Sequence, residues 1–588
     1  MHKNGFRTSS RCPDAARIQD MPTLATRMLR VALSLAAARA ATVTIGAIIS
    51  DANATLYGRR ESFAAQLAVD AVNADSTLLA GHHLELRIVD DGGSGWTAMR
   101  AACELMRGGV HALIGPSYSS TSLSVLGLTT PLKVPLLSYS ATSPSLGADS
   151  GHGYFARVVP SDAAQGPAMI SVVQHHNWTQ VCILFADNTY ATSGAIETQE
   201  AATRAGIKVL SLQSYDATSK NATRALQTLA ESGCRIFLNW CGGTSATDCR
   251  DVMGQASDAG LLRGGDFVWL LSDGCENGIG YEPTMYAGFG DSLVGTLCLV
   301  PSPNDNGAAT RTAARQALLD SWPASHGSSP PIYASFLYDG VLAAARALHA
   351  APAAALANPF SLGAAGACVP DMAAPAAPWE HGDAVRAALA TLSFDGATAA
   401  ASRPVALTPN LERQHSTYSL HNLQHWPGVG SSVGTFQVVG AVHVTRSTAS
   451  APATAAVSMS AAVQWSATDG PYAPVPSDVL PREVCVVVAI QEPYVYFVGE
   501  DEDPDCTAAR CDVASEQFSC PPSCYRGLAI DTLKQVAFHA GFSYRIHHTP
   551  PAGYTQILRD HLQPRLQFGS RAAQLWTRIP PIPVRVRL

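Results

Sequence analysis

The sequence is poor in charged residues and has no long apolar run. Charged residues make up 14% of its 588 residues, against about 25% in an average soluble domain. No apolar stretch reaches the roughly 18 residues of a membrane-crossing helix, so we predict no transmembrane segment. The net charge is -7, and there is no basic stripe, RNA-binding signature or zinc-finger spacing. These absences exclude nucleic acid as an expected partner.

Catalytic motifs are also scarce. The chain has no phosphate-binding loop, no His-Glu-x-x-His metal motif and no nucleophile elbow. Residues 290–293 read Gly-Asp-Ser-Leu, the signature of a family of serine esterases, but they lie in mid-chain and no late Asp-x-x-His partner follows. We therefore expect no enzyme activity, no cofactor and no metal site. At roughly 150 residues per domain, the length allows two to four domains.

The amino terminus has the pattern of a secretory signal. Basic residues precede a short apolar stretch, 31–38, and residues 38–40 read Ala-Arg-Ala, a small-x-small cleavage pattern. We interpret 1–42 as a leader with a signal peptide; a disordered leader is the alternative, and Met21 and Met28 are alternative starts. Fourteen cysteines fit an oxidising compartment. Three sequons give the candidate glycosylation sites Asn53, Asn177 and Asn221.

From residue 43 onward, apolar strands alternate with helical stretches. Strands separated by helices imply right-handed crossovers and a parallel sheet. The first series has strands at 43–50, 84–91, 110–116 and 134–140 and helices at 60–74, 97–106 and 119–132. The second has strands at 180–187, 208–215, 234–240 and 267–273 and helices at 163–175 and 222–232. Two such sheets, joined where the chain crosses and later returns, predict a two-lobed α/β clamshell.

The lobes are expected to be discontinuous in sequence. We place the first lobe at 43–160 with 323–442 and the second at 161–322, because the pattern predicts that the chain crosses once and returns once. Within the return, helices are predicted at 339–349 and 382–392 and strands at 418–424 and 436–442. The clamshell as a whole is therefore predicted to span 43–442.

Three further segments follow the clamshell. Residues 443–482 become Ala/Ser/Thr/Pro-rich without a period, which is typical of a tether between domains. A second α/β domain begins at 483 and stops near 556 without completing. Residues 557–588 are basic, contain proline and lack periodicity, which predicts an aberrant or disordered tail.

The run from Val110 to Gly194 carries a resemblance to a known family. It contains HALIGP, VPLLSYSATSPSL, RVVPSD and HHNWTQVCILFADNTYATSG in that order. On these residues, 43–442 resembles the type I periplasmic-binding-like amino-terminal domain of glutamate receptors. Residues 484–555 resemble the first half of the type II ligand-binding domain of ionotropic glutamate receptors. The matching motifs there are EPYV at 492–495 and Y-R-G-x-x-I-D at 525–531.

The resemblance implies the ligand-sensing region of a glutamate receptor-like ligand-gated ion channel, which closes on an amino acid or similar small zwitterion. The alternatives are a class C G-protein-coupled receptor ectodomain, a secreted solute-binding protein and an amino-terminal domain that only assembles subunits. An extracellular or cell-surface location is implied, with the parent receptor in the plasma membrane and a homo- or hetero-oligomer of receptor subunits. After Thr555 the family's Pro-Leu-Thr segment, agonist-gripping arginine and pore helices are absent. As written, we expect the chain not to conduct ions and to reach a membrane only through a missing pore region.

The chemistry of a zwitterion indicates the ligand-binding residues. Its carboxylate needs hydroxyls and backbone N–H groups, and its ammonium needs carboxylates and an aromatic face. Such side chains, including Ser120, follow the predicted strands, where ligands bind in open α/β sheets. The resemblance to metabotropic receptors implies that the ligand is held by Ser119, Ser140 and Thr142 from the first lobe and Asp162, Tyr190 and Asp273 from the second. Taken singly, each has a structural alternative as a helix cap or core residue.

Two further positions come from the resemblance alone. Tyr494 in EPYV corresponds to the aromatic residue that covers the agonist in ionotropic receptors; a core tyrosine at a strand end is the alternative. The first-lobe basic residue that grips a distal acidic group has no match here. Arg59 and Arg60 lie beside its expected place and Glu61 occupies it. Glutamate is therefore one candidate ligand, and a smaller or neutral amino acid is another.

The cysteines divide into three groups. The resemblance implies a disulfide between Cys103 and Cys368. The pairing of the second-lobe cysteines cannot be read from the sequence; they are Cys234, Cys241, Cys249, Cys275 and Cys298. Four more lie between the two motifs of the second domain: Cys506, Cys511, Cys520 and Cys524. Their spacing fits no zinc template well, so two disulfides are favoured there.

Overall fold

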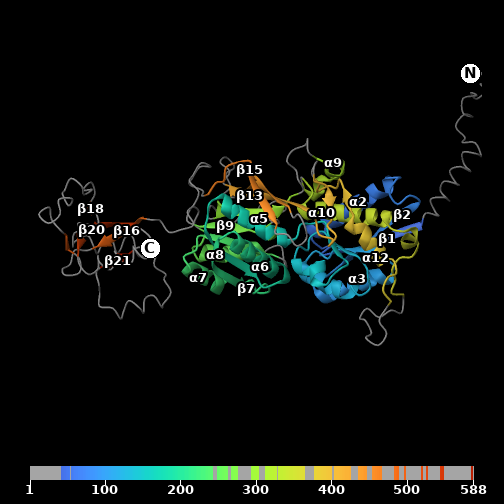
Figure 1. Ribbon diagram of the computed structural model, residues 1–588, viewed down its shortest axis with the longest axis horizontal. Coiled ribbons are helices and arrows are strands. Elements are labelled where there is room, and N and C mark those ends of the chain that lie inside the picture. Colours follow the sequence, from blue (N-terminus) through green and yellow to red (C-terminus); the bar gives the residue numbers. More distant parts are fainter. Residues whose placement is uncertain are drawn as a thin grey trace, which may run out of the picture. The chain divides into compact units, whose positions relative to one another are not determined.

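The computed structural model describes the clamshell almost throughout and only short strands of the later segments (Figure 1). The described ranges are 41–52, 54–242, 248–262, 267–275, 293–302, 311–327, 329–363, 377–399, 403–424, 435–445, 453–465, 483–488, 496–497, 518–520, 525–526, 543–548 and 584–586. The chain divides into two compact units, Met1–Thr228 with Phe237–Pro474 and Leu229–Ile236 with Val475–Leu588. Each unit is described by itself.

The first lobe is built on a five-stranded parallel sheet with the order β2-β1-β3-β4-β5. Its central strand β1 is buried almost throughout, as expected for a strand covered by helices on both faces. The strands are β1 Ala41–Ile49, β2 His82–Asp90, β3 Ala112–Ile114, β4 Leu136–Ser138 and β5 Phe155–Arg157. The helices are α2 Leu56–Ala74, α3 Gly95–Arg107, α4 Ser119–Thr129, α10 Ile332–Ala350, α11 Ala353–Ala357 and α12 Gly382–Ala390. The parallel sheet expected from the sequence is confirmed.

The second lobe has an eight-stranded mixed sheet with the order β15-β14-β13-β10-β9-β8-β6-β7. Its parallel part is covered by helices, whereas β13, β14 and β15 run antiparallel along one side. The strands are β6 Gln180–Ala186, β7 Lys208–Tyr215, β8 Ile236–Trp240, β9 Val268–Leu271, β10 Leu297–Pro301, β13 His415–Gln424, β14 Thr435–Thr445 and β15 Thr454–Met459. The helices are α5 Asp162–His175, α6 Thr189–Arg204, α7 Thr223–Glu231 and α8 Asp248–Asp258.

The helices begin where short polar side chains can accept from free backbone N–H groups. Thr55 accepts from Gly58 N at the start of α2, and Ser94 accepts from Thr97 N at the start of α3. In the second lobe, Asn188 accepts from Ala191 N at the start of α6. These caps fix the ends of the helices that face the carboxyl edges of the two sheets.

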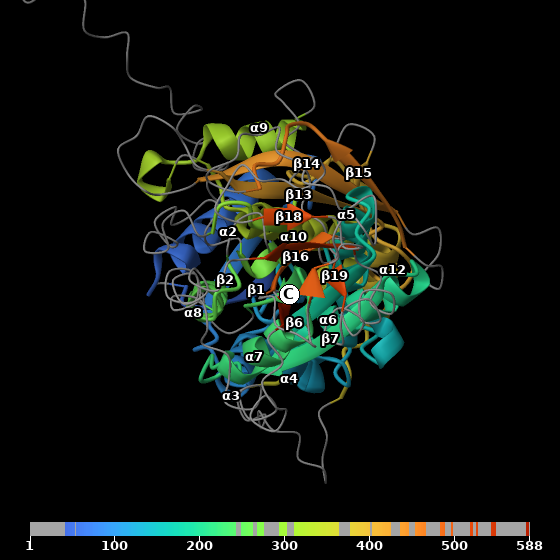
Figure 2. The same cartoon turned by 90° about the vertical axis from the view of Figure 1, so that its left-hand side faces the viewer.

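The predicted lobe boundary is wrong for the end of the return. Residues 403–442 were assigned to the first lobe, but β13 pairs antiparallel with β10 and β14 pairs with β13. Both strands therefore extend the sheet of the second lobe (Figure 2). The period-two pattern of these segments identifies them as strands, but an apolar face does not specify which sheet will cover it. Helix α10 does return to the first lobe, where it packs against α2.

The predicted tether at 443–482 is wrong for part of its length. β15 pairs with β14 from Gly440↔Met459 to Thr445↔Thr454 and forms the edge of the sheet. Its residues alternate between exposed and half-buried, a pattern that the Ala/Ser/Thr-rich composition conceals. Beyond it, Trp465 is buried, with its ring 5.8 Å from that of Trp178. Composition alone therefore mistook a weak edge strand for a linker.

The part of the second unit from Val475 onward is described only as backbone strands. β16 Glu483–Val488 pairs parallel with β20 Ser543–His548, and β18 Phe518–Cys520 is antiparallel to β20. A parallel pair of strands is what an α/β domain beginning at 483 requires. β21 Val584–Val586 pairs antiparallel with β16, so the predicted irregular tail contains three residues of strand. A second short pair joins β17 Tyr496–Phe497 and β19 Tyr525–Arg526.

Disulfides cross-link the second lobe, where Cys182 and Cys234 are disulfide-bonded and two further bridges are resolved as pairs. Cys241 bonds Cys249, and Cys275 bonds Cys298. Cys103 is also disulfide-bonded, but its predicted partner Cys368 lies outside the described residues, so that pairing stays a prediction. The four cysteines of the second domain lie outside the residues whose side chains are described, so their pairing also stays a prediction.

The structure describes two of the three candidate glycosylation sites. The candidate glycosylation residues Asn177 and Asn221 are exposed, while Asn53 and the leader at 1–40 lie outside the described residues. Within the described ranges, none of the helices combines the length and the hydropathy that crossing a bilayer requires.

Candidate ligand-binding site

The predicted first-lobe residues lie at the carboxyl edge of its parallel sheet. The loop after β3 carries Ser119, and the loop after β4 carries Ser140 and Thr142. The chain then passes through β5 into the second lobe at Asp162. In open α/β sheets this edge is where ligands bind. The loops therefore meet where the sequence predicted a site.

Asp162 is fully buried and its carboxyl group is unsatisfied. It is the first residue of α5, but the cap of that helix is Ser161, whose hydroxyl accepts from Ala163 N at 3.3 Å. Neither carboxyl oxygen of Asp162 has a hydrogen-bond partner among the described residues. The Thr142 hydroxyl lies close enough to lower the pKa of Asp162, but its contact does not meet the geometry of a hydrogen bond. The structural alternative of a capping aspartate is therefore wrong.

Burial and a second acidic group act on Asp162 together. Desolvation is the main cause that raises its pKa well above the usual value, and the charge of Asp273 adds to it. The charge of Arg157 opposes the shift, while that of Glu197 adds to it. Burying two carboxyl groups close together is costly unless a cation or hydrogen-bond donors compensate.

Asp273 is held by two tyrosines from different elements. It follows β9 and begins a short 3-10 helix, Asp273–Cys275. The Tyr190 hydroxyl donates to Oδ1, and the Tyr333 hydroxyl of α10 donates to Oδ2. Burial raises the pKa of Asp273, and these two hydrogen bonds oppose the rise. Since α10 belongs to the first lobe, the Tyr333 bond joins the lobes beside the buried carboxyl pair.

Tyr190 has both a packing role and a polar role. Its ring lies edge-on to Trp240 with centroids 5.6 Å apart. Its hydroxyl also donates toward Ser272 Oγ at 2.8 Å, and burial raises the pKa of the phenol well above its usual value. The phenol is therefore a neutral donor fixed beside Asp273. The ring of Tyr190 packs as a core tyrosine would, whereas its hydroxyl group forms part of the candidate site.

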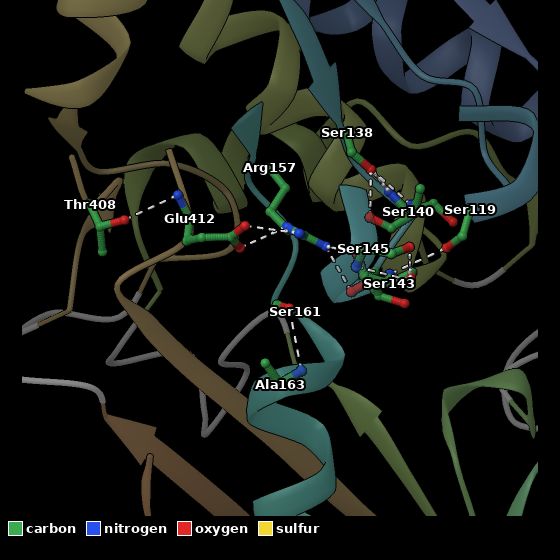
Figure 3. A network of polar contacts seen from close by, with 12 residues as sticks. Ser119, Ser138, Ser140, Ser143, Ser145, Arg157, Ser161, Ala163, Thr408 and Glu412 are labelled. Atoms are coloured by element: carbon green, nitrogen blue, oxygen red, sulfur yellow. Dashed lines mark hydrogen bonds and ion pairs between the residues drawn. The ribbon is translucent and has the colours of Figure 1, made fainter. Parts of the chain in front are cut away.

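The hydroxyl side of the site connects the two lobes, and Figure 3 shows its first-lobe part around Ser119 and Ser143. Ser119 does not cap α4; its Oγ accepts from Ser143 N at 3.3 Å. The Ser143 hydroxyl donates to Ser193 Oγ on α6 at 2.8 Å. Ser140 is half-buried, and its N–H donates to Ser138 Oγ at 3.3 Å. The structure thus joins Ser119 to the loop that carries Thr142 but records no side-chain contact between Ser140 and the rest.

A buried arginine fixes this loop from behind. Arg157 Nη1 donates to the carbonyl oxygens of Thr142 at 2.7 Å and Ser143 at 2.9 Å. Arg157 also forms a two-contact ion pair with Glu412 at 2.7 and 2.8 Å, which Figure 3 shows. From the other side, Asp162 N donates to Thr142 O at 3.0 Å. The backbone between the predicted ligand residues is therefore rigidly placed.

Sequence reasoning missed Arg157 and Tyr333. Arg157 lies in a short buried strand, where its type is unusual, and this is the one signal that could have drawn attention to it. Tyr333 stands among apolar residues at the start of α10, and no local pattern separates it from a core tyrosine. Tyr494 lies outside the described residues, so its predicted role stays a prediction.

A cavity of about 510 Å³ opens beside these residues. It lies between the first turns of α4 and α6, and its polar lining comes from both lobes. The lining residues are Ser120, Asp187, Asn188, Thr189, Thr192, Ser193, Ala217 and Thr218. None of the predicted ligand residues lines it, but Ser193 accepts from Ser143, so the cavity adjoins the predicted site. Among the described residues, no group of three His, Cys, Asp or Glu side chains is placed to hold a metal.

The fold and the site define a ligand-binding clamshell of the type I periplasmic binding protein class. The chain superposes on a leucine binding protein, LivK, from Thermotoga maritima with a TM-score of 0.52. The match covers 67% of this chain and 98% of that one at 16% identity, which shows the fold alone. The family model "Receptor family ligand binding region" matches residues 60–425. The chain belongs to this receptor ligand-binding family.

Two curated relatives have names that point the same way. The chain is 24% identical over 377 residues to "Metabotropic glutamate receptor-like protein E" of Dictyostelium discoideum, covering 63% of this chain and 40% of that protein. It is 28% identical over 223 residues to "Glutamate receptor 3.1" of Oryza sativa subsp. japonica, covering 38% of this chain and 23% of that protein. The chain spans less than half the length of either relative. It is a glutamate-receptor-like ligand-binding region, as the sequence resemblance indicated.

Proposed function

We propose that the two lobes bind an α-amino acid between them and that binding favours their closed arrangement. The observation that carries this proposal is the buried carboxyl group of Asp162, which has no partner at either oxygen. Asp273 beside it accepts from the hydroxyls of Tyr190 and Tyr333. A ligand ammonium would supply both the missing donors and the missing positive charge.

The other end of the zwitterion would meet hydroxyl and amide groups. Ser119 lies in the first turn of α4, where the helix dipole favours an anion. Ser140 and Thr142 lie in the neighbouring loop. A ligand carboxylate there would face donors from the first lobe while its ammonium faces carboxyls from the second. Because the donors come from one lobe and the carboxyl groups from the other, the arrangement supports a ligand that bridges the lobes.

Closure would follow as a population shift. A ligand that bonds to both lobes stabilises the arrangement in which both sets of contacts are made. Each charge-assisted hydrogen bond contributes about 1.5–3 kcal/mol, so a few of them suffice to shift the equilibrium. The Tyr333–Asp273 and Ser143–Ser193 bonds would add to the closed state without ligand.

We place this clamshell in the extracellular sensing region of a ligand-gated, glutamate receptor-like channel. The expected order of the two domains and the name of the rice relative support this placement, whereas the name of the Dictyostelium relative supports the class C alternative. A class C G-protein-coupled receptor and a solute-binding protein remain the alternatives. A transcript that continues past Thr555 into pore helices would support the channel, and one that continues into seven membrane-spanning helices would support the class C receptor.

Binding is tested by thermal unfolding of the full chain with each common amino acid at millimolar concentration. At a concentration 100 times the Kd, a ligand stabilises by about 2.7 kcal/mol, which raises the melting temperature by several degrees. Asp162→Asn should remove most of that rise, whereas Asp258→Asn, at an exposed aspartate on α8, should retain it. The proposal fails if none of the amino acids changes the melting temperature.

A second candidate role is the assembly of subunits through the first lobe. Trp96 on α3 is 64% exposed and Leu123 on α4 is 38% exposed. These two helices pack against each other, and large exposed apolar side chains support a protein contact there. Sedimentation of the full chain with and without Trp96→Ser tests it. A dimer that the substitution dissociates would favour assembly, and a monomer at all concentrations would exclude it.

A further inference from the structure

A second unsatisfied carboxyl group lies in the first lobe. Glu61 of α2 is fully buried, and the Tyr139 hydroxyl donates to its Oε2 at 2.8 Å. The Tyr57 hydroxyl also acts on this carboxyl and lowers its pKa, but Oε1 has no hydrogen-bond partner among the described residues. The charge of Asp91 acts on it, and burial raises its pKa to about 8. A carboxyl oxygen buried without a partner costs free energy that a donor would restore.

The surroundings of Glu61 are acidic. Asp91 is also fully buried; Ser50 Oγ donates to it at 2.8 Å and Gly93 N donates at 2.8 Å. Burial is the main cause that raises the pKa of Asp91, and the charges of Asp90 and Asp51 add to it.

The two arginines that precede Glu61 do not pair with it. Arg59 Nη1 donates to the carbonyl oxygen of Ala54 at 3.4 Å. The guanidinium of Arg60 lies beside Gly327, since a Cβ atom on that glycine would come within 3.0 Å of Arg60 Nη2. The charged group that acts on the Glu61 carboxyl is the acidic Asp91.

Through its hydrogen bond with Tyr139, Glu61 contacts a loop that also carries residues of the proposed ligand site. Ser117 and Tyr139 form a 2.6 Å hydrogen bond, and they precede Ser119 and Thr142 in the same two loops. Neighbouring strands lie about 4.8 Å apart, so groups above adjacent strand ends are separated by about 5–10 Å. An extended chain of four methylenes, with bonds of about 1.5 Å, covers about 6 Å. A side chain of that length could reach from one cluster to the other.

We propose that the ligand is an α-amino acid whose side chain ends in a cation, such as lysine or ornithine, with the distal cation bound by Glu61. This inference rests on the proposed amino-acid binding and specifies its substrate class. The distal cation supplies a donor to Glu61 Oε1 and a counter-charge to Asp91. An acidic side chain in the same place meets two carboxyl groups, which selects against glutamate.

The test compares lysine with norleucine, which has the same carbon chain and no distal amine. Isothermal titration calorimetry of the full chain should give a Kd for lysine about ten-fold or more below that for norleucine. Glutamate should bind more weakly than either. Glu61→Gln should bring the lysine Kd to that of norleucine and leave the norleucine Kd unchanged. Glu104→Gln, at an exposed glutamate on α3, should keep the wild-type preference.

The outcomes separate this inference from the proposed function. If norleucine or glutamate binds as tightly as lysine to the wild-type chain, the distal cation site is overturned while amino-acid binding stands. An unchanged lysine-to-norleucine ratio in Glu61→Gln overturns it in the same way. If no amino acid binds, the proposed function itself fails. The wild-type ratio decides the question even if the Glu61 variant does not fold.

Discussion

Two buried charged clusters flank the same loop, and they differ in how well they are satisfied. Behind the loop, Arg157 is matched by Glu412 and by two backbone carbonyl groups. In front of it, the carboxyl oxygens of Asp162 have no hydrogen-bond partner among the described residues, and Asp273 accepts from two phenols rather than from a cation. Buried charges in a structural role are normally paired. We infer from this difference that the Arg157 cluster stabilises the fold and that the Asp162 cluster is completed by a bound cation.

A third cluster supports this interpretation. Asp339 of α10 is as buried as Asp162, but it accepts from Ala397 N at 2.5 Å and Thr398 N at 2.8 Å. Arg413 donates to Thr398 Oγ1 at 2.9 Å and its charge lowers the pKa of Asp339 in part. Burial alone therefore does not leave an aspartate unsatisfied in this fold. The lack of hydrogen-bond partners at the Asp162 carboxyl is therefore a feature of the candidate site and not of buried aspartates in this fold.

The largest loss of stability should come from removing Arg157, whose charge is paired with Glu412. Arg157→Met leaves Glu412 and the carbonyl groups of Thr142 and Ser143 without their donor. Removing one partner of a buried pair costs about 3–5 kcal/mol, and Glu412 keeps some solvent contact, which favours the lower end. Urea unfolding of the full chain measures the change. A loss under about 1 kcal/mol would contradict the structural role assigned to Arg157.

The next effect is a dependence of stability on pH that comes from Glu61. Its pKa is raised from 4.5 to about 8, so the folded state binds a proton more tightly than the unfolded state. The stability from this group is complete below about pH 4.5 and is lost as the pH rises toward about 8. The wild-type free energy of unfolding, relative to Glu61→Gln, should fall by up to about 1.4 kcal/mol per pH unit in that window. A difference that is flat with pH would mean that Glu61 is solvated.

A smaller effect of opposite sign is expected at the incomplete cluster. Asp162→Asn removes a buried acidic group that has no partner, so the unliganded chain should gain about 1–2 kcal/mol. The same variant should lose the ligand response. Asp339→Asn is the matched comparison, because that carboxyl is satisfied and its replacement should destabilise. Equal losses at Asp162 and Asp339 would remove the distinction between the two clusters.

The smallest effect concerns the contact between the lobes. Ser193→Ala removes the acceptor of the Ser143 hydroxyl, and a single hydrogen bond of this kind contributes about 0.5–1.5 kcal/mol. The unliganded clamshell should open more readily, which small-angle scattering would detect as a larger radius of gyration without ligand. Addition of ligand should restore the wild-type radius. An unchanged radius in the unliganded variant would show that this bond does not hold the lobes together.

The sequence predicted the lobes of the clamshell better than their borders. Apolar strands and amphipathic helices are local patterns, and α2, α3, α5 and α12 begin within about four residues of their predicted starts. The sheet that β13 and β14 join depends on β10, more than a hundred residues away, and no local pattern encodes such a pairing. β15 was missed because its small polar residues resemble a linker.

The candidate site was predictable in part for the same reason. Ser119, Thr142 and Asp162 follow strand ends, and the topology brings strand ends together wherever the sheets are parallel. Tyr190 and Asp273 come together in the second lobe by the same logic. Tyr333 and Arg157 reach the site from a helix and a strand whose contacts depend on the packing of the lobes. Their roles become visible only from the hydrogen bonds that they make.

The most direct test of the account is a crystal structure of the chain with lysine bound. The account predicts the α-ammonium within hydrogen-bond distance, about 2.7–3.2 Å, of Asp162 and next to Asp273, with both oxygens of Asp162 satisfied. A ligand seated elsewhere, with Asp162 still buried and unpartnered, would contradict it.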